Sequence, residues 1–232
     1  MSDNKSLIQQ IHKFVFPYIN SNMYVLMENR SALVVDPHSS AEAIDCMKKN
    51  GVLKVLCLLT HEHFDHTNGI SNLRMNFNTH LICQQNAISP KSQKYSNRPT
   101  VVSIILRDRG MDKEADEIEN QFRPYTYTAE ETFDTHMDTV WEGHRIHLES
   151  TPGHSPSSCL IWLDDIICFT GDSLIPNTET TTRWPGSNAK LYYSDTLPKL
   201  QKISASTYIF PGHGDPIKMD KLKYADNMFT IV

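Results

Sequence analysis

The chain has 232 residues, of which 39% are hydrophobic and 21% charged, and these proportions are typical of a globular domain. No Gly/Ser-rich or Pro-rich linker interrupts the chain, so we predict a single domain over residues 1–232. The formal net charge of −5 argues against a nucleic-acid binder that works through a broad basic face. No continuous apolar stretch reaches about 18 residues, so we expect no membrane span and no membrane partner.

The N-terminal segment and the cysteines both favour a cytoplasmic protein. The opening residues, MSDNKSLIQQIHKFVFP, have no continuous apolar core and no small-residue cleavage site, so we expect no signal peptide. The five cysteines include no pair with Cys-x-x-Cys spacing, and most lie in apolar surroundings. We therefore predict reduced, mostly buried thiols.

The first part of the chain predicts strands and one helix. Met23–Leu26 and Ala32–Val35 are expected to pair as a hairpin. A helix is expected to start at Ser39, whose spacing from Glu42 is that of a capping box. The next segment, Val52–Leu59, is a nearly continuous apolar run. Its length is typical of a strand buried on both faces.

The middle of the chain is less regular. A helix is predicted at Gly69–Met75 and a short strand at His80–Cys83. We predict that residues 84–131 form a mostly helical insertion that acts as a lid or a dimer contact. Its charged stretch, Arg107–Glu119, is typical of a solvated helix face. The insertion also carries side chains that could meet a substrate, namely Arg107, Arg109, Arg123, Tyr125 and Tyr127.

Strand patterns return in the last third of the chain. They cover Arg145–Glu149, Ser158–Leu163 and Ile166–Thr170, and Thr207–Phe210 is expected to be the last strand. Between them, Ser194 is predicted to cap a helix. The alternation of strands and helices predicts an α/β layered domain, and in such folds ligands gather at the carboxyl ends of strands.

Four polar clusters each follow one of these apolar runs. Each cluster carries imidazole or carboxylate groups beside a small or turn-forming residue, and glycine there allows a sharp bend of the backbone. Imidazole nitrogens and carboxylate oxygens are ligands that Zn²⁺ accepts. The clusters are His61–His66, Thr151–Ser155, Thr170–Ser173 and Pro211–Asp215.

The first cluster alone is dense enough in ligands to start two metal sites. His61 and His63, two apart on an extended chain, can point to one side and hold one metal. Asp65 and His66 follow a turn and can point to a second metal. The second and fourth clusters each supply one more histidine, and the two oxygens of Asp172 could bridge. The predicted metal ligands are His61, His63, Asp65, His66, His154, Asp172 and His213.

These motifs resemble those of the metallo-β-lactamase-fold hydrolase superfamily. The resemblance spans about Met23 to Pro216 and covers residues 84–131 least well. It implies a four-layer αββα sandwich with the site at one edge of the two sheets. The matching residues are Asp36 in LVVDP, the His61–His66 motif, His154 in TPGH, Asp172 in TGDS and His213 in PGHGD.

The resemblance also implies a role for each ligand and two Zn²⁺ ions per chain, with Fe or Mn as alternatives. For Asp36 two interpretations stay open: it orients ligands from behind, or it caps the turn before Pro37. Outside the ligand set, His38 is the histidine nearest to the motifs. In the family, residues at these positions hold a first metal (His61, His63, His154), hold a second (Asp65, His66, His213) and bridge the two (Asp172).

Within the superfamily, GDSL followed by TTRWPGSNA most resembles small glyoxalase II-like (hydroxyacylglutathione hydrolase-like) proteins. The aspartate at Asp172 and the lack of an export signal distinguish the chain from exported β-lactamases. Because 19 residues follow His213, we expect no glutathione-gripping helical domain at the C-terminus. Lactonases place a tyrosine where Ile175 lies, and Tyr192 or Tyr193 could replace it.

Hydrolysis of a small-molecule thioester, ester or lactone is the first functional hypothesis. Two Zn²⁺ ions would make a hydroxide from a shared water. Asp65 would orient this hydroxide and pass a proton to the leaving group. The alternatives are an acyl-homoserine lactonase-like hydrolase and a persulfide dioxygenase-like oxidoreductase, with one Fe(II) held by His61, His154 and Asp172. A non-catalytic binding protein is disfavoured because all seven ligands are present. We expect a small-molecule substrate, no nucleic-acid partner, and leave a homodimer open.

Overall fold

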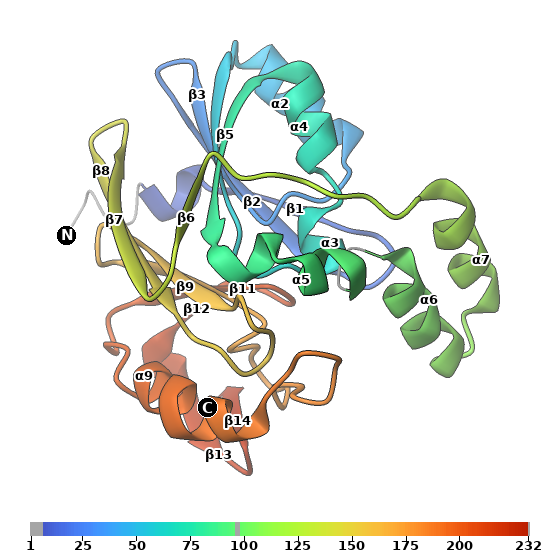
Figure 1. The fold of residues 1–232 in the computed structure, drawn as a ribbon. Helices are drawn as coiled ribbons and strands as arrows, with labels where there is room; N and C mark the ends of the chain where they lie inside the picture. The colour runs from blue at the N-terminus through green and yellow to red at the C-terminus, as the bar shows by residue number, and fades with distance from the viewer. Residues whose placement is uncertain (1–6, 96–97, 232) are drawn as a thin grey trace.

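The computed structural model describes residues 7–95 and 98–231, in which two six-stranded sheets lie face to face with helices on their outer faces (Figure 1). This is the four-layer αββα sandwich expected from the sequence, and the α/β class is confirmed. A separate two-stranded ribbon follows the second sheet near the C-terminus.

The first sheet runs in the order β1-β2-β3-β4-β5-β6. The predicted hairpin is present as β2 and β3, and its turn residues Asn29 and Arg30 have φ angles of 48° and 62°, which suit the twist of a tight hairpin. From β3 to β6 the strands are parallel, so their carboxyl ends meet along one edge. The strands are β1 (His12–Val15), β2 (Asn22–Glu28), β3 (Ser31–Val35), β4 (Lys54–Leu58), β5 (Asn78–Gln84) and β6 (Glu131–Phe133).

The second sheet runs in the order β12-β11-β10-β9-β8-β7. Strands β9 and β10 are antiparallel around a turn at Asp164 and Asp165, and β11 is parallel to β10. The carboxyl ends of β10 and β11 therefore lie at the same edge. The strands are β7 (His136–Trp141), β8 (His144–Ser150), β9 (Cys159–Leu163), β10 (Ile167–Gly171), β11 (Tyr208–Pro211) and β12 (Ile217–Lys218).

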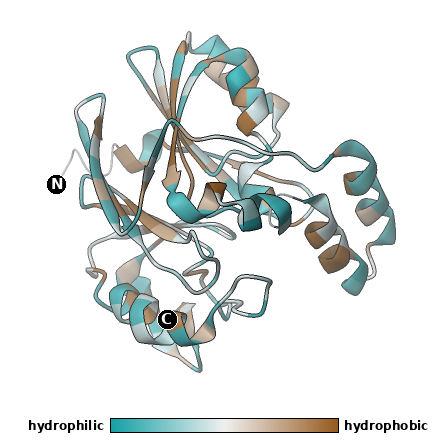
Figure 2. Cartoon of the chain, viewed as in Figure 1, coloured by the Kyte–Doolittle hydropathy of each residue, from teal (hydrophilic) through white to brown (hydrophobic). Residues whose placement is uncertain are grey.

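Three apolar cores hold the four layers together. Between the sheets, Leu58 belongs to the same buried cluster as Ile161 and Phe169. On the outer face of the first sheet, Leu73 belongs to a second cluster, and on that of the second sheet Leu200 belongs to a third. Figure 2 shows brown, apolar residues along the strands where the layers meet. Strand β4 contributes to two of these cores, so the prediction that it is buried on both faces is confirmed.

The helices cover the outer faces of the sheets and one end of the sandwich (Figure 1). Those beside the first sheet and its carboxyl edge are α2 (Ala41–Lys49), α3 (Phe64–Thr67), α4 (Ile70–Asn76), the 3₁₀ turn η1 (Gln85–Ile88), α5 (Pro90–Tyr95), α6 (Pro99–Asp108) and α7 (Asp112–Gln121). Those near the second sheet are α8 (Ala189–Leu191), the π-helical turn η2 (Tyr192–Thr196), α9 (Leu197–Gln201) and the 3₁₀ turn η3 (Met219–Lys221).

Both predicted helix caps are wrong. The hydroxyl of Ser40 accepts from the backbone N–H of Ala43, so Ser40 caps α2. The backbone N–H of Ser39 donates instead to Asn68, which ties Ser39 to the segment before α4. In the second case the helical segment starts at Ala189, earlier than predicted, and Ser194 lies inside it.

Because the helical segment starts at Ala189, Pro198 lies inside it, and a π-helical turn makes this possible. Asn188 caps the segment through its side-chain oxygen, which accepts from the N–H of Leu191. Pro198 cannot donate to a carbonyl in the preceding turn. The turn η2 lies directly before α9 and relaxes the regular hydrogen-bond ladder at that point.

In the described part of the predicted insertion, residues 84–95 and 98–131, there are four short helical segments, η1, α5, α6 and α7. The charged stretch Arg107–Glu119 is not one helix face, because α6 ends at Asp108 and α7 starts at Asp112. Gly110 between them has a φ of +74°, a conformation that glycine adopts at low cost. The two helices form a hairpin that projects from one end of the sandwich (Figure 1). Its action as a lid stays a prediction.

Strands missed by the sequence analysis are short or lie at edges. Strands β1, β6 and β7 were not predicted, and β11 is not the last strand, because β12, β13 (Leu222–Ala225) and β14 (Met228–Ile231) follow it. Strand β12 has only two residues, and β1 is largely exposed. Neither carries enough apolar residues to give a periodic signal.

The five cysteines are unpaired, and all but Cys46 are buried. Burial raises the pKa of the Cys83 thiol to about 12, so this thiol stays protonated. Among the described residues, no helix is long and apolar enough to cross a membrane.

His144 links the two sheets and predicts a pH-dependent stability. Its ring lies 2.6 Å from Asp164 and 3.1 Å from Glu28. Burial acts to lower the pKa of His144, but hydrogen bonds to Asp164 and Glu28 outweigh it and raise the pKa. The linkage therefore stabilises the fold below about pH 6.5 and is lost as the pH rises through the raised pKa.

We expect His144→Gln to destabilise the protein by about 1 kcal/mol at pH 6, and by less at pH 9. The measurement is urea unfolding of both proteins at the two pH values. An equal destabilisation at both would contradict the charged link.

Candidate metal centre

The seven predicted ligands lie together where strand ends of both sheets meet. The chain leaves β4 at Leu58 and reaches His61 three residues later, and α3 follows directly after His63. Asp172 follows the last residue of β10, and His213 lies two residues after β11. His154 lies in the loop between β8 and β9.

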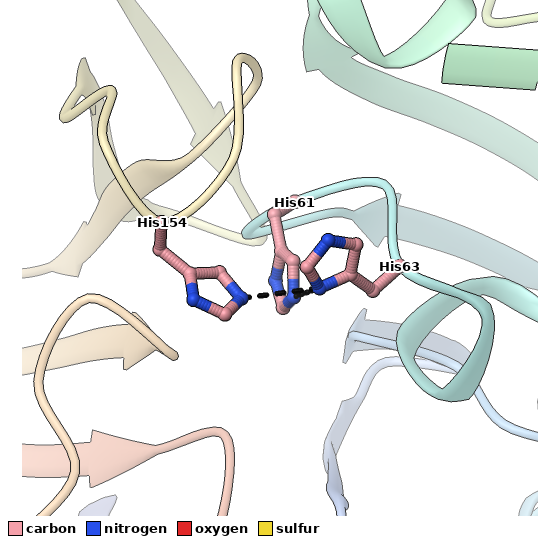
Figure 3. Close-up of side chains that lie close together, drawn as sticks. All are labelled: His61, His63 and His154. Carbon is pink, nitrogen blue, oxygen red and sulfur yellow. Dashed lines mark hydrogen bonds between the residues drawn. The ribbon is translucent and has the colours of Figure 1, made fainter. Parts of the chain in front are cut away.

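Three histidines form one compact group, shown in Figure 3. The Nδ1 atom of His63 lies 3.1 Å from Nε2 of His61 and 3.1 Å from Nε2 of His154. The rings of His61 and His154 are nearly perpendicular, at 80°. Three ring nitrogens from two separate loops therefore converge on one point.

A second group consists of Asp65, His66 and His213. The Oδ2 atom of Asp65 lies 3.1 Å from Nε2 of His66 and 3.5 Å from Nε2 of His213. Asp172 lies between the groups, with Oδ2 at 3.5 Å from Nε2 of both His154 and His213 and Oδ1 at 3.6 Å from Nε2 of His66. This is the position that a bridging carboxylate would need.

Hydrogen bonds behind the rings decide which nitrogens are free to bind a metal. Carbonyl and carboxylate oxygens only accept, so a ring nitrogen beside one carries the proton. The Thr60 hydroxyl already donates to Asp36, so it also accepts from the ring. In the neutral form of each ring, Nε2 is therefore the nitrogen left to bind a metal ion, and four such Nε2 atoms face the site. The Nδ1 contacts are His61 to Thr60 Oγ1 (3.0 Å), His66 to Asp36 Oδ2 (3.0 Å), His154 to the Thr181 carbonyl (2.9 Å) and His213 to the Ile19 carbonyl (3.1 Å).

The two groups differ in the direction in which their surroundings shift the histidine pKa values. Burial lowers the pKa of His61 and His63, and burial together with His63 lowers the pKa of His154 to about 4. Around the second group, burial acts to raise the pKa of Asp65, but His66 and His213 lower it. Burial acts to lower the pKa of His66 and His213, but nearby carboxylates outweigh it and raise both, so a bound metal ion would displace protons from these rings. Neutral imidazoles and ionised carboxylates are the forms that bind metal ions.

The residues fit a metal site on two further observations. His66 Nε2 and Asp172 Oδ1 are buried without a hydrogen-bond partner, and among the described residues no other side-chain nitrogen or oxygen is left so. An unpartnered buried polar atom costs about 1–3 kcal/mol. In the first group, His63 Nδ1 has at most one proton to share between two lone pairs. A cation would satisfy all of these atoms.

Asp36 orients the ligands. Its carboxylate accepts from the backbone N–H of Thr60 (2.7 Å), the Thr60 hydroxyl (2.6 Å) and the His66 ring. It also lies near His61, but its oxygens are already engaged by these three donors. Its φ of +55° is uncommon outside glycine, and aspartate is one of the residues that tolerates it. Of the two sequence interpretations, the orienting role is the one that these contacts support.

Glu62 joins the loops of the first group, and the sequence analysis gave it no role. Its carboxylate accepts from the hydroxyl of Ser155 at 2.7 Å and from that of Ser157. Since Glu62 lies between His61 and His63, and Ser155 follows His154, this contact fixes one loop against the other. The signal was present in the sequence as a carboxylate inside the histidine motif and hydroxyls after TPGH.

Glycines let the turns approach each other closely. Gly171 has a φ of +48°, and a Cβ there would lie 2.3 Å from the Thr60 hydroxyl. Gly212 is needed for space alone, because a Cβ would lie 2.2 Å from the Asp172 carboxylate. The prediction that glycine allows a sharp bend of the backbone therefore applies to Gly171. At Gly212, glycine is needed because the backbone passes close to the Asp172 carboxylate.

A cavity of about 390 Å³ opens onto the two groups. Its volume falls within the range of small-molecule sites, about 300–1,000 Å³. Helix α6 supplies one wall, and the segment after Asp172 another. The lining residues outside the ligand set are Ile19, Asn20, Phe64, Val101, Val102, Ile105, Arg109, Ile175, Thr178, Thr181 and Trp184.

Of the insertion residues proposed to meet a substrate, only Arg109 lines this cavity. Arg107 pairs with Asp116 of α7 at 2.7 Å. The other insertion candidates also have protein partners or lie buried: Arg123 donates to the Glu119 carbonyl, the Tyr125 hydroxyl contacts the Thr67 hydroxyl, and Tyr127 is buried.

Three more side chains singled out from the sequence also lie elsewhere. The Tyr192 hydroxyl donates to the Ser173 carbonyl and Tyr193 is largely exposed, so neither replaces the lactonase tyrosine in the cavity wall. The His38 ring lies 3.1 Å from the Phe14 carbonyl, apart from both groups.

Comparison with known proteins agrees with this arrangement. The sequence model of the metallo-beta-lactamase superfamily matches residues 17–213. The chain belongs to this superfamily. It is 26% identical over 200 residues to the probable metallo-hydrolase YqgX of Bacillus subtilis, covering 84% of this chain and 86% of that protein. It is 23% identical to a hydroxyacylglutathione hydrolase of Tolumonas auensis, over 90% of this chain and 68% of that enzyme.

Solved structures of the superfamily share the fold. The BLEG-1 B3 metallo-beta-lactamase aligns with a TM-score of 0.71 at 22% identity, over 90% of this chain and 94% of that one. TTHA1623 in a di-iron-bound form aligns with a TM-score of 0.66 at 17% identity, over 90% and 95% of the two chains. At these identities the likeness concerns the fold alone.

The contacts of Asp36 predict a test of ligand orientation. Asp36→Asn keeps the size and tolerates the same backbone, but it replaces one accepting oxygen by a donor. We expect about 10- to 100-fold weaker metal binding with an unchanged far-ultraviolet circular dichroism spectrum. Titration against a chelating dye measures this. Asp45→Asn, on the exposed part of α2, should bind metal like the wild type, and equal affinity for all three proteins would contradict the role.

Proposed function

We propose that the protein is a hydrolase that holds two divalent metal ions, Zn²⁺ first among them, and cleaves a thioester or ester bond of a small molecule. One observation carries this proposal: four histidines direct Nε2 into the site, while their Nδ1 atoms are engaged behind. Asp172 stands between the two groups, in reach of both.

The chain's own residues divide the work. His61, His63 and His154 would hold one ion, and Asp65, His66 and His213 the other. When bound, such ions lower the pKa of water and polarise a carbonyl oxygen. The cavity then holds the substrate beside the ligands, with Phe64 and the wall of α6 limiting the access of bulk water.

Asp65 is placed to handle a proton. Its Oδ2 atom faces the cavity and the nitrogens of His66 and His213. We propose that its carboxylate orients the attacking water, accepts the proton that this water loses, and then passes that proton to the leaving group. A thiolate leaves with little help, whereas an alkoxide depends on that proton.

The proposal of a glyoxalase II-like substrate rests on the similarity of the chain to hydroxyacylglutathione hydrolases. Those of Tolumonas auensis and Vibrio vulnificus are among its relatives, and the match covers 68% and 66% of those enzymes. We therefore propose thioesters as the first class to test, with lactones second. The free, mostly buried thiols support a cytoplasmic location as part of the same proposal.

Metal content is the direct test of the proposed centre. We expect about two zinc ions per chain by elemental mass spectrometry on protein purified without chelator or affinity-tag metal. Removal by a chelator should abolish thioester hydrolysis, and Zn²⁺ should restore it.

About one iron per chain would instead favour the persulfide dioxygenase alternative, and oxygen uptake with glutathione persulfide would follow. Protein that takes up no metal after reconstitution would rule out both functions.

The proton role of Asp65 predicts unequal losses in Asp65→Asn. Substitution of a ligand can lower metal occupancy, which reduces every activity by the same factor. The ratio of ester to thioester hydrolysis removes that factor. We expect this ratio to fall by about 100-fold, because only the ester needs the proton. If kcat/KM falls equally for both substrates, Asp65 acts as a ligand alone.

A further inference from the structure

The cavity wall formed by α6 is an apolar stripe that ends in a cation. Val101, Ile105 and Arg109 line the cavity and are spaced four residues apart. Residues with this spacing lie on one face of a helix, and at about 1.5 Å per residue the stripe extends about 12 Å. Ile175 and Trp184 add apolar surface elsewhere in the lining.

Arg109 is the one lysine or arginine among the described residues that line the cavity. Among the described residues, it forms no ion pair. Arg107, two positions earlier, pairs with Asp116 and Glu119 at 2.7 and 3.4 Å. The carboxylates of the hairpin thus engage Arg107 and leave the guanidinium of Arg109 available to a ligand.

We propose that Arg109 selects the substrate: a thioester or ester with an apolar segment and, beyond it, an oxyanion group that pairs with the guanidinium. Guanidinium groups bind carboxylate and phosphate in a two-pronged geometry. The apolar segment contacts Val101 and Ile105 while the reacting carbonyl lies at the ligand groups. This inference rests on the proposed function and adds its substrate class.

The test uses substrates that differ in one group. Two thioesters share a thiol and have acyl chains of equal length, one ending in a carboxylate and the other in a methyl group. A second pair carries the carboxylate or a neutral amide on the thiol part, and a phosphate-ended substrate distinguishes the two kinds of oxyanion. We expect the wild-type enzyme to prefer at least one oxyanion-bearing member.

Arg109→Gln should lower kcat/KM for the preferred substrate by about tenfold or more, mostly through KM, and leave the neutral substrate nearly unchanged. Arg109→Lys should recover part of the loss. The matched control is Arg98→Gln, which removes the same charge at the other end of α6, outside the cavity. A wild-type enzyme without preference, equal losses on both members of a pair, or an equal effect in the control would overturn the proposal.

A binding experiment separates this inference from the proposed function. Thioether analogues of the same pairs cannot be hydrolysed, and calorimetry measures their affinity. If the wild type hydrolyses nothing yet binds the oxyanion-ended analogue more tightly through Arg109, the proposed reaction fails and the recognition stands. If the charged and neutral analogues bind equally, the recognition fails even where hydrolysis is found.

Discussion

The convergence of five imidazoles and two carboxylates on one buried point is the constraint on which the rest of the structure depends. Lone pairs that face each other without protons repel, and each buried polar atom without a partner costs about 1–3 kcal/mol. The fold holds this arrangement because every ring but that of His63 is fixed from behind through Nδ1. Asp36 is the centre of that support, since it holds Thr60, and through it His61, as well as His66. The same constraint links stability to metal binding, because a bound cation would remove the cost.

The two groups of candidate ligands form only because strand ends of both sheets meet at one edge. This close approach explains the tight turns at Gly171 and Gly212. Thr60 touches both halves of the site: its hydroxyl bonds Asp36, and a side chain on Gly171 would collide with it. Asn22 adds a second link, since its side chain donates to the carbonyls of Pro211 and Gly214 on either side of His213. The ligands therefore depend on packing between the sheets as much as on their own motifs.

The seven residues that converge could be predicted from the sequence because their signal is local. Imidazoles and carboxylates at short spacing, each after an apolar run, need no knowledge of distant contacts. The pairing of Glu62 with Ser155 could not be predicted in this way, because the partners lie 93 residues apart and neither motif alone requires the other. The helix caps failed for a related reason: Ser39 and Ser40 are equally good caps locally, and a tertiary bond from Ser39 to Asn68 decides between them. The difference between Arg107 and Arg109 likewise depends on a tertiary contact: Asp116 of α7 pairs with Arg107, whereas Arg109 forms no ion pair among the described residues.

The cavity wall formed by α6 is not independent of the candidate ligands. Phe64 lies between His63 and Asp65 in the chain and belongs to the same buried cluster as Val102 and Leu106 of α6. A shift of α6 would move Phe64, and with it the two ligands on either side. The His61–His66 motif must therefore hold His63 and Asp65 in place while Phe64 between them stays packed against α6 of the insertion. Substitutions at Val101 and Ile105 of α6, and at Arg109 directly after it, can then change the cavity lining. This holds provided that Leu106 and Val102, which also lines the cavity, keep their packing on Phe64. Neighbouring residues of a helix point about 100° apart, so these two tasks fall on adjacent faces of one short helix.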